Sequence, residues 1–233
     1  MDFSCAVFDS NGDLIANAPH TPVHLGSMDR SVASVIKAHP KMHKGDVFVT
    51  NAPYNGGTHL PDITVITPVF HKDEAQPVFF VASRGHHADV GGTAPGSMTP
   101  LATHIEDEGV ILENLKLVSN GKFLHLEIFE TLTQNKYPCR NPNQNIADLK
   151  AQIAANEKAS MAAGASIAVV GWWTGYKLGG VVALFTAEFF QNLGVADYWQ
   201  ATFLILGILI ILMNIGLMFV HEPIETNRQV KQR

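Results

Sequence analysis

The stretch Asn51–Asp62 reads NAPYNGGTHLPD and carries the strongest chemical signal of the chain. His59 and Asp62 lie three residues apart, behind the pair Gly56-Gly57 and on either side of Pro61. Paired glycines allow backbone conformations closed to other residues, and proline fixes the turn that follows. Imidazole nitrogen and carboxylate oxygen together suit a divalent metal of intermediate hardness. The stretch therefore predicts a metal-binding turn around which this half of the chain is folded.

A second His/Asp cluster, SRGHHAD at Ser83–Asp89, follows in similar glycine-rich surroundings. Between the clusters lie two β-rich runs, Ile63–Phe70 and Val78–Ala82, separated by the polar turn His71–Gln76. These runs predict two neighbouring antiparallel strands. In such a hairpin the start of the first strand lies beside the end of the second, so the clusters are expected to meet. The side chains expected to converge there are His59, Asp62, His86 and His87.

The remaining first half predicts an α+β fold. Residues 3–16 read as two strands joined by an Asn-Gly turn, and residues 28–38 read as a helix capped by Ser27. A further helix is expected over residues 146–156, with Asn145 as its cap. His20 and His24 lie in a proline-containing loop and are interpreted as local hydrogen-bonding residues rather than metal ligands.

Composition excludes several classes of protein. The chain has 233 residues, a net charge of −5 and 16% charged residues, and its basic residues form no stripe, which argues against nucleic-acid binding. Its two cysteines, Cys5 and Cys139, form no Cys-x-x-Cys motif and indicate a reducing compartment. Cys139 has no partner base at a suitable spacing and is interpreted as an inert buried thiol.

Six motifs in order identify a resemblance. They are DFSCAVFD, PVHLGSM, GGTHLPD, SRGHHADVGG, PGSM and RNPNQNIADLKAQIAAN. Together they closely resemble the hydantoinase B family, the B-type half of ATP-dependent 5-oxoprolinases and hydantoinases. The resemblance covers residues 2–157 and implies that residues 1–157 are a hairpin-and-helix fragment of a larger hydantoinase B domain.

The resemblance implies ring opening of a cyclic amide, either 5-oxoproline or a hydantoin, with ATP used by an A-type partner subunit. The chain itself shows no glycine-rich phosphate loop, so ATP is expected only through that partner. The family pattern maps a divalent metal (Zn, Mn or Fe) onto His59, Asp62 and His86. The expected catalytic set is Asp62, His87 and Arg84, and Arg84 would either hold a substrate carboxylate or form a structural ion pair.

Residues 158–233 predict a different environment. Ranges 162–190 and 198–220 are long and carry few charges, so we expect two transmembrane helices and a lipid bilayer as partner. The distribution of Lys and Arg predicts a membrane location with the N-terminal domain and the C-terminal tail in the cytoplasm. This half resembles one helix pair of a major-facilitator transporter. The alternative function is therefore a membrane transporter fragment, or an inactive fusion of the two families.

Overall fold

A computed structural model describes residues 2–17, 21, 24, 26–71, 74–97 and 99–217, with the backbone alone for 164–179, 210 and 212–217. The described residues form a mixed α+β fold with a seven-stranded antiparallel sheet in the order β2-β1-β5-β4-β3-β6-β7. The strands are β1 (Phe3–Asp9), β2 (Leu14–Asn17), β3 (Val47–Thr50), β4 (Asp62–Val69), β5 (Phe79–His86), β6 (Leu115–Ser119) and β7 (Lys122–Phe123). The helices are α2 (Met28–Ala38), α3 (His125–Thr133), α4 (Pro142–Asn192) and α5 (Tyr198–Leu217), with short 3-10 turns η1 (Pro53–Asn55) and η2 (Ile105–Asp107).

The central hairpin β4–β5 has the predicted antiparallel pairing. Its register places Asp62 opposite His86 and Val69 opposite Phe79. Strand β1 pairs with the other edge of β5, with Phe3 opposite Gly85. Three adjacent strands therefore bring their ends to the same side of the sheet, which is where the predicted clusters lie.

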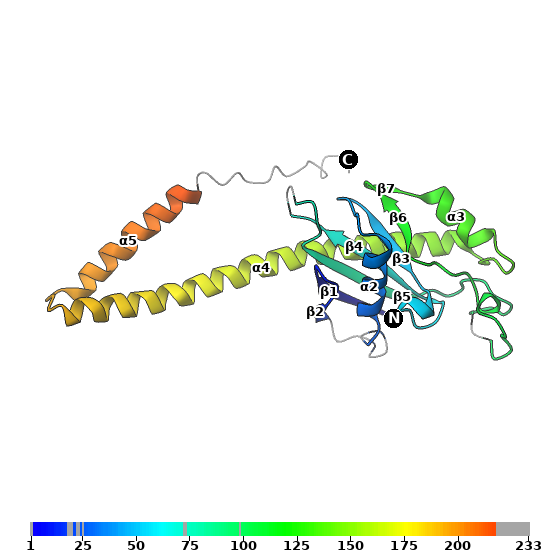
Figure 1. Ribbon diagram of the computed structural model, residues 1–233, viewed down its shortest axis with the longest axis horizontal. Coiled ribbons are helices and arrows are strands. Elements are labelled where there is room, and N and C mark those ends of the chain that lie inside the picture. Colours follow the sequence, from blue (N-terminus) through cyan, green and yellow to red (C-terminus); the bar gives the residue numbers. More distant parts are fainter. Residues whose placement is uncertain are drawn as a thin grey trace. The chain divides into compact units, whose positions relative to one another are not determined.

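Alternation along these strands separates two faces of the sheet. On one face, Phe8, Ile66 and Phe80 are fully or almost fully buried and pack with Met28 and Val32 of α2. Helix α2 forms because its apolar residues recur at helical spacing, and Figure 1 shows it lying against this face of the sheet. The burial of these side chains fixes α2 beside the end of the sheet that carries the clusters.

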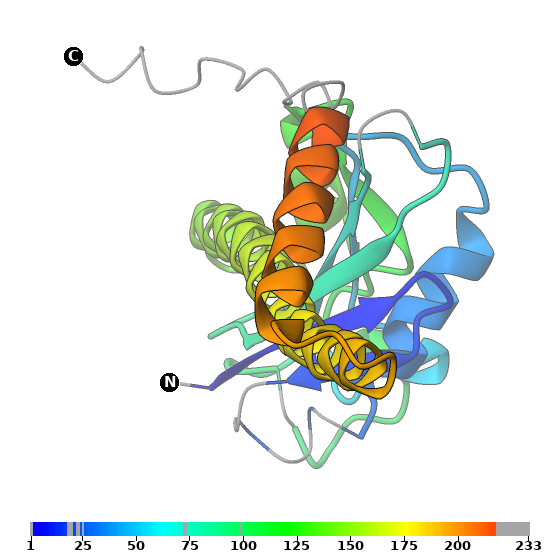
Figure 2. The ribbon, with the colours of Figure 1, turned by 90° about the vertical axis from the view of Figure 1, so that its left-hand side faces the viewer.

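The opposite face is covered by the first part of α4. Ile63 and Val65 of the sheet belong to one buried cluster with Ile146 and Leu149 of this helix. Figure 2 shows α2 and α4 on opposite sides of the strands. The helix also binds the sheet through buried amides, because Asn156 Nδ2 donates to the Val65 carbonyl oxygen at 3.0 Å and the Val81 carbonyl oxygen at 3.3 Å.

The face under α2 changes from apolar to polar along the strands. Phe80 and Ala82 of β5 are apolar and buried, whereas Arg84 and His86, further along the same face, are polar. The cross-strand neighbours of Arg84 are Ser4 and Thr64, which are also polar and buried. Along these strands, the apolar core is therefore followed first by the paired polar residues Ser4, Arg84 and Thr64. The pair Asp62 and His86 comes next.

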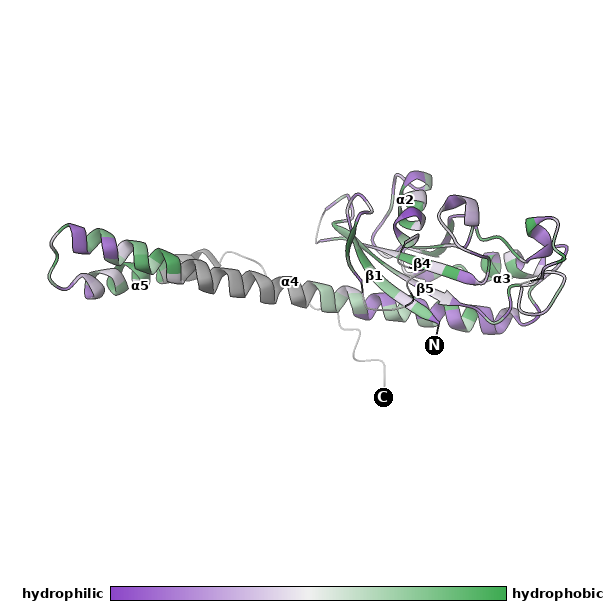
Figure 3. Cartoon of the chain, turned by 90° about the horizontal axis from the view of Figure 1, so that it is seen from below, coloured by the Kyte–Doolittle hydropathy of each residue, from purple (hydrophilic) through white to green (hydrophobic). Residues whose placement is uncertain are grey.

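The predicted transmembrane helix pair is not found among the residues that the structure describes. Range 162–190 is no separate span, because it continues the helix that begins at Pro142 on the sheet, and it carries Lys177 and Glu188. Figure 3 shows hydrophilic and hydrophobic residues alternating at the start of α4, while the described part of α5 is mostly hydrophobic. Within the described part of the chain, no helix combines the length and the apolar character that crossing a bilayer requires. The fold class with a transmembrane hairpin, the lipid partner and the membrane location with cytoplasmic ends are therefore wrong predictions.

The contacts divide the chain into two units, Met1–Gly164 and Ala165–Arg233. The sheet, α2, α3 and the first part of α4 belong to the first unit, while the second contains the end of α4 and helix α5. Residues 218–220 of the second predicted span, and the tail after them, lie outside the described residues. The predicted division at residues 157 and 158 stays a prediction.

Candidate metal centre

Asp62 is the centre of the predicted site. Its side chain is fully buried, and Thr58 Oγ1 donates a hydrogen bond to its Oδ2 at 2.7 Å. The same Oδ2 lies 3.0 Å from His59 Nδ1 and 3.3 Å from His24 Nε2. The other oxygen, Oδ1, lies 3.1 Å from His86 Nδ1. Three imidazole nitrogens from different segments therefore face one carboxylate.

The charge state of Asp62 is set by opposing effects. Burial alone raises the pKa of the carboxyl group, because it penalises the charged form. The hydrogen bond from Thr58, the charge of His59 and the hydrogen bond with His86 outweigh burial and leave the pKa below its ordinary value. Asp62 is consequently an anion at neutral pH, which is the form that binds a cation.

The turn that carries His59 is fixed against α2 at Gly56. This glycine has φ of +90°, and a Cβ atom there would lie 2.4 Å from the backbone of Arg30 and Ser31. Only glycine allows this close approach. Ser31 Oγ then donates to the Gly56 carbonyl oxygen at 2.7 Å, so the turn is bonded to the helix three residues before His59.

The other end of the turn is held by Asn51. Its buried side-chain amide donates to the carbonyl oxygens of Leu60 at 2.8 Å and Val110 at 3.0 Å, and its oxygen accepts from the Leu112 backbone N–H at 2.6 Å. These three bonds tie the segment before Asp62 to a distant part of the chain. Asn51 is a site-shaping residue that was not assigned a role from the sequence.

His24 lies beside Asp62 and forms hydrogen bonds, as its interpretation expected, but with residues that are distant in sequence. It is buried, and its Nδ1 lies 2.9 Å from Ser4 Oγ, so that Nε2 faces Asp62. No local pattern reveals this contact, because the loop that carries His24 joins the site only through the fold. The available signal was the buried hydroxyl of Ser4, which alternation places on the same face as Asp62.

Arg84 lies on β5, two residues before His86, and is fully buried. Its guanidinium donates to Thr64 Oγ1, Ser27 Oγ, Ser31 Oγ and the Gly56 carbonyl oxygen. Burial lowers the pKa of Arg84 to about 10, and the negative charge of Asp62 opposes that shift. Arg84 therefore stays protonated, and its described bonds go to neutral oxygens that link α2, β4 and the Gly56 turn.

His87 is buried on the opposite face from His86. Its Nε2 lies 3.1 Å from Gln152 Oε1, and its Nδ1 lies 3.1 Å from Asn145 Nδ2, both on α4. Burial lowers the pKa of His87 and favours the neutral ring. The neutral ring donates from Nε2 and accepts at Nδ1, so both nitrogens are used by the helix. The structure thus brings His59, Asp62 and His86 together and places His87 apart from them.

The donor set fits a divalent metal. One ligand atom from each of His59, Asp62 and His86 lies within 4.8 Å of the others. His59 and His86 keep about a third of their side chains exposed, at 35% and 29%, so the cluster is reachable from solvent. Two imidazole nitrogens and one carboxylate oxygen are ligands of the kind that Zn, Mn and Fe accept. These three residues are the ones that would hold the ion.

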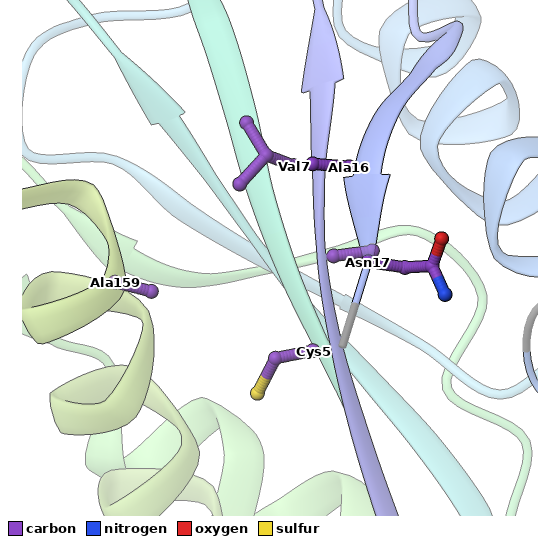
Figure 4. Close-up of a pocket in the computed structure, with 6 residues that line it drawn as sticks. Cys5, Val7, Ala16, Asn17 and Ala159 are labelled. Atoms are coloured by element: carbon purple, nitrogen blue, oxygen red, sulfur yellow. The ribbon is translucent and has the colours of Figure 1, made fainter. Parts of the chain in front are cut away.

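The cysteines lie outside this cluster. Cys139 is buried, as the sequence predicted, and burial raises the pKa of its thiol to about 12. Cys5 lines a small, largely apolar pocket of about 170 Å³ between β1, β2 and α4, and burial raises its pKa as well. Figure 4 shows the Cys5 side chain pointing from β1 toward α4. The register of β1, β5 and β4 places Cys5 and Asp62 on opposite faces of the sheet. This pocket offers no second ionisable ligand.

Named relatives and a solved structure are similar to this chain. The 5-oxoprolinase of Dictyostelium discoideum is 50% identical over 159 residues, and the 5-oxoprolinase of Saccharomyces cerevisiae is 48% identical over 165 residues. Each match covers 68% of this chain, but the chain spans only 12% and 13% of those relatives. The crystal structure of an ATP-dependent caprolactamase from Pseudomonas jessenii matches 81% of this chain and 32% of its own, with a TM-score of 0.64 and 26% identity.

The family model for Hydantoinase B/oxoprolinase matches residues 1–176. The match includes the turn that carries His59, the strands of the sheet and the first part of α4, and it extends past residue 157. The sequence identity to the named 5-oxoprolinases agrees with this assignment. The chain belongs to the Hydantoinase B/oxoprolinase family.

Proposed function

We propose that this chain supplies the metal-binding part of an ATP-dependent ring opening of a cyclic amide, such as 5-oxoproline or a hydantoin. The observation that carries the proposal is the convergence of imidazole nitrogens on the buried carboxylate of Asp62. A buried ionisable group whose pKa is shifted by burial and by specific charged neighbours marks a candidate functional site, and Asp62 is such a group.

The substrate class is inferred from the relatives. The named relatives are 5-oxoprolinases, and the solved structure is a caprolactamase, so each name denotes an enzyme of a cyclic amide. Because the chain spans a small part of those proteins, their complete activity is proposed only for an assembly that contains this chain. We assign the ATP-dependent step to an A-type partner, since the sequence contains no phosphate-binding loop.

The residues have different proposed roles. His59, Asp62 and His86 hold a divalent ion, which would supply Lewis-acid polarisation of the amide oxygen or an activated water. Arg84 and His87, which the sequence placed in the catalytic set, are proposed as positioning residues because protein groups occupy their donors and acceptors. Arg84 fixes the Gly56 turn, and His87 fixes the end of β5 to α4.

The test is metal binding followed by turnover. We expect the purified chain to bind about one tightly held divalent ion, and His59→Ala to lose it, as measured by metal analysis after dialysis. His71→Ala, a change at an exposed histidine in a turn, is the matched control and should bind like the wild type. Adding an A-type subunit, ATP and 5-oxoproline should then release glutamate. Equal metal content in wild type and His59→Ala would refute the metal assignment. Absence of glutamate would refute 5-oxoproline as the substrate, and absence of product from a hydantoin as well would refute the catalytic assignment.

A further inference from the structure

We propose that the second unit of the chain docks on the second unit of another copy, so that the protein forms a two-fold symmetric dimer. The inference is independent of the proposed function, because it concerns the end of α4 and helix α5 rather than the metal cluster. Among the described residues, 21 large apolar side chains are exposed, and 14 of them lie in the short range from Val181 to Ile211. The exposed apolar surface of the chain is therefore concentrated on this unit.

Two rows of apolar side chains run along these helices. In each row the residues recur at intervals of three or four positions, which places them on one side of the helix. Each of these side chains is between 47% and 68% exposed. Each helix thus presents a continuous apolar row to a partner. The residues are Val181, Phe185 and Phe189 on α4, and Leu204, Ile208 and Ile211 on α5.

Within one copy, the two helices leave these rows uncovered. Ala187 and Thr202, which lie near the turn on either side of it, are buried, whereas the rows stay exposed. Figures 1 and 2 show α5 turning away from the end of α4 after that turn. Apolar surface of this extent gains free energy when it is removed from water, and on soluble proteins it marks an interaction site.

The charge of this surface favours a second copy over a charged partner. From Val181 to Leu217 the sequence contains two formal charges, Glu188 and Asp197. Figure 3 shows the described part of α5 as mostly hydrophobic. A nucleic acid or a strongly charged protein would find few groups to pair with here. A second copy brings the same apolar rows, and two-fold pairing buries the rows of both copies in one four-helix arrangement.

The exposed area is sufficient for a stable dimer. Phe185, Phe189 and Phe203 are 60–68% exposed, so each leaves on the order of 100 Å² of apolar surface open to water. Together with the aliphatic side chains, one copy presents on the order of 1,000 Å², whereas a standard stable interface buries about 800 Å² per partner. The second unit therefore supplies enough surface without a contribution from the first.

The test is the mass of the full chain, measured by sedimentation equilibrium in buffer without detergent over a series of concentrations. We expect the wild type to reach twice the chain mass of 25.3 kDa. Leu204→Glu and Phe185→Glu each place a charge in the apolar interface, so each should raise the dissociation constant of the dimer at least about tenfold. Leu126→Glu is the matched control, because Leu126 is a similarly exposed leucine on helix α3 of the first unit, and it should dimerise like the wild type.

The outcomes are distinct from those of the metal experiment. A wild type that stays monomeric at every concentration would overturn the dimer. A dimer that both glutamate variants leave intact would also overturn it, since the copies would then meet elsewhere. A monomer that co-sediments with phosphatidylcholine vesicles would show that lipid is the occupant, and species larger than a dimer would contradict two-fold closure. Far-ultraviolet circular dichroism of each variant checks that the helices are retained.

Discussion

His86 and His87 are adjacent in sequence, yet they lie on opposite faces of the sheet and have different surroundings. His86 faces Asp62, and 29% of its side chain is exposed at the edge of the sheet. His87 is 3% exposed as a whole residue and lies between two side-chain amides of α4. The face under α4 pairs its polar groups with one another, whereas the face under α2 gathers several nitrogens around one carboxylate.

This difference separates a structural polar network from a binding site. In the first, the ring nitrogens of His87 and the amide N–H groups of Asn145 and Gln152 have partners within the protein, so the value of these bonds lies in stability. In the second, three nitrogens and a hydroxyl compete for two oxygens, and a cation would satisfy them better than they satisfy one another. Changes on the α2 face should therefore alter metal binding, and changes on the α4 face should alter stability.

The largest expected effect is on metal binding in Asp62→Asn. The substitution removes the carboxylate to which all the site nitrogens point, so the affinity for Mn²⁺ should fall by at least about 100-fold, or about 2.8 kcal/mol. Isothermal titration measures the change. Asp46→Asn is the matched control, because Asp46 is also a fully buried carboxylate but is bonded to Lys116 Nζ at 2.9 Å. An equal loss of affinity in both variants would show that the effect is not specific to the site.

The next effect is on stability in Asn156→Leu. The amide of Asn156 donates to two strand carbonyls and to Thr67 Oγ1, and leucine leaves these buried acceptors without that donor. The free energy of unfolding should fall by about 2–3 kcal/mol. Urea denaturation measures it, and Mn²⁺ affinity of the folded protein should stay unchanged. The neighbouring exposed variant Glu157→Gln should stay within about 0.5 kcal/mol of wild type. If Asn156→Leu also stays within that range, the helix amides do not hold α4 on the sheet.

A smaller effect is expected when His86 and His87 are replaced one at a time. His86→Gln should weaken Mn²⁺ binding by roughly tenfold or more, with little change in unfolding free energy. His87→Gln should cost about 1–2 kcal/mol of stability, because glutamine cannot reproduce both bonds to Asn145 and Gln152, while Mn²⁺ affinity stays near that of wild type. Each variant is measured by both titration and urea denaturation. The reverse pattern would place the binding site on the α4 face.

Sequence reasoning found the part of the site that local register controls. The two β-rich runs and the turn between them determine that Asp62 and His86 meet, and the structure pairs them directly. Successive side chains of a strand also point to opposite faces of the sheet, and this rule places His86 and His87 on different faces. That rule was applied to the hairpin but not to the histidine pair, so His87 was expected to converge with His59, Asp62 and His86 and was placed in the catalytic set.

The other missed features depend on contacts that no local pattern contains. His24 reaches Asp62 from a loop, and the bond to Ser4 that orients it joins residues 20 positions apart. For the second half, a low count of formal charges was taken as a sign of transmembrane helices. Low charge alone does not define a bilayer span, and the first predicted span is the continuation of a helix whose start packs on the sheet.

The smallest expected effect is a change in how the unfolding free energy depends on pH. It concerns Asp46, a buried carboxylate that lies outside the cluster of His59, Asp62 and His86. Burial raises the pKa of Asp46, but hydrogen bonds from Lys116 and from the backbone N–H groups of Asn120 and His43 lower it below its ordinary value. A lowered folded pKa stabilises the protein above the unfolded pKa, about 3.9, and this stabilisation is lost as pH falls through the folded value. Below about pH 4, unfolding free energy should therefore fall less steeply in Asp46→Asn than in wild type, by at most about 1.4 kcal/mol per pH unit.

Urea denaturation at several pH values below 4.5 measures this difference in slope, with Glu157→Gln as the control. The slope, rather than the absolute stability, is the readout, because replacing Asp46 also removes the ion pair with Lys116. Added Mn²⁺ should leave the difference in slope between wild type and Asp46→Asn unchanged. Asp46 is not among the residues grouped as possible metal ligands. Parallel pH curves for the two proteins would mean that the Lys116 bond does not depend on the charge of Asp46.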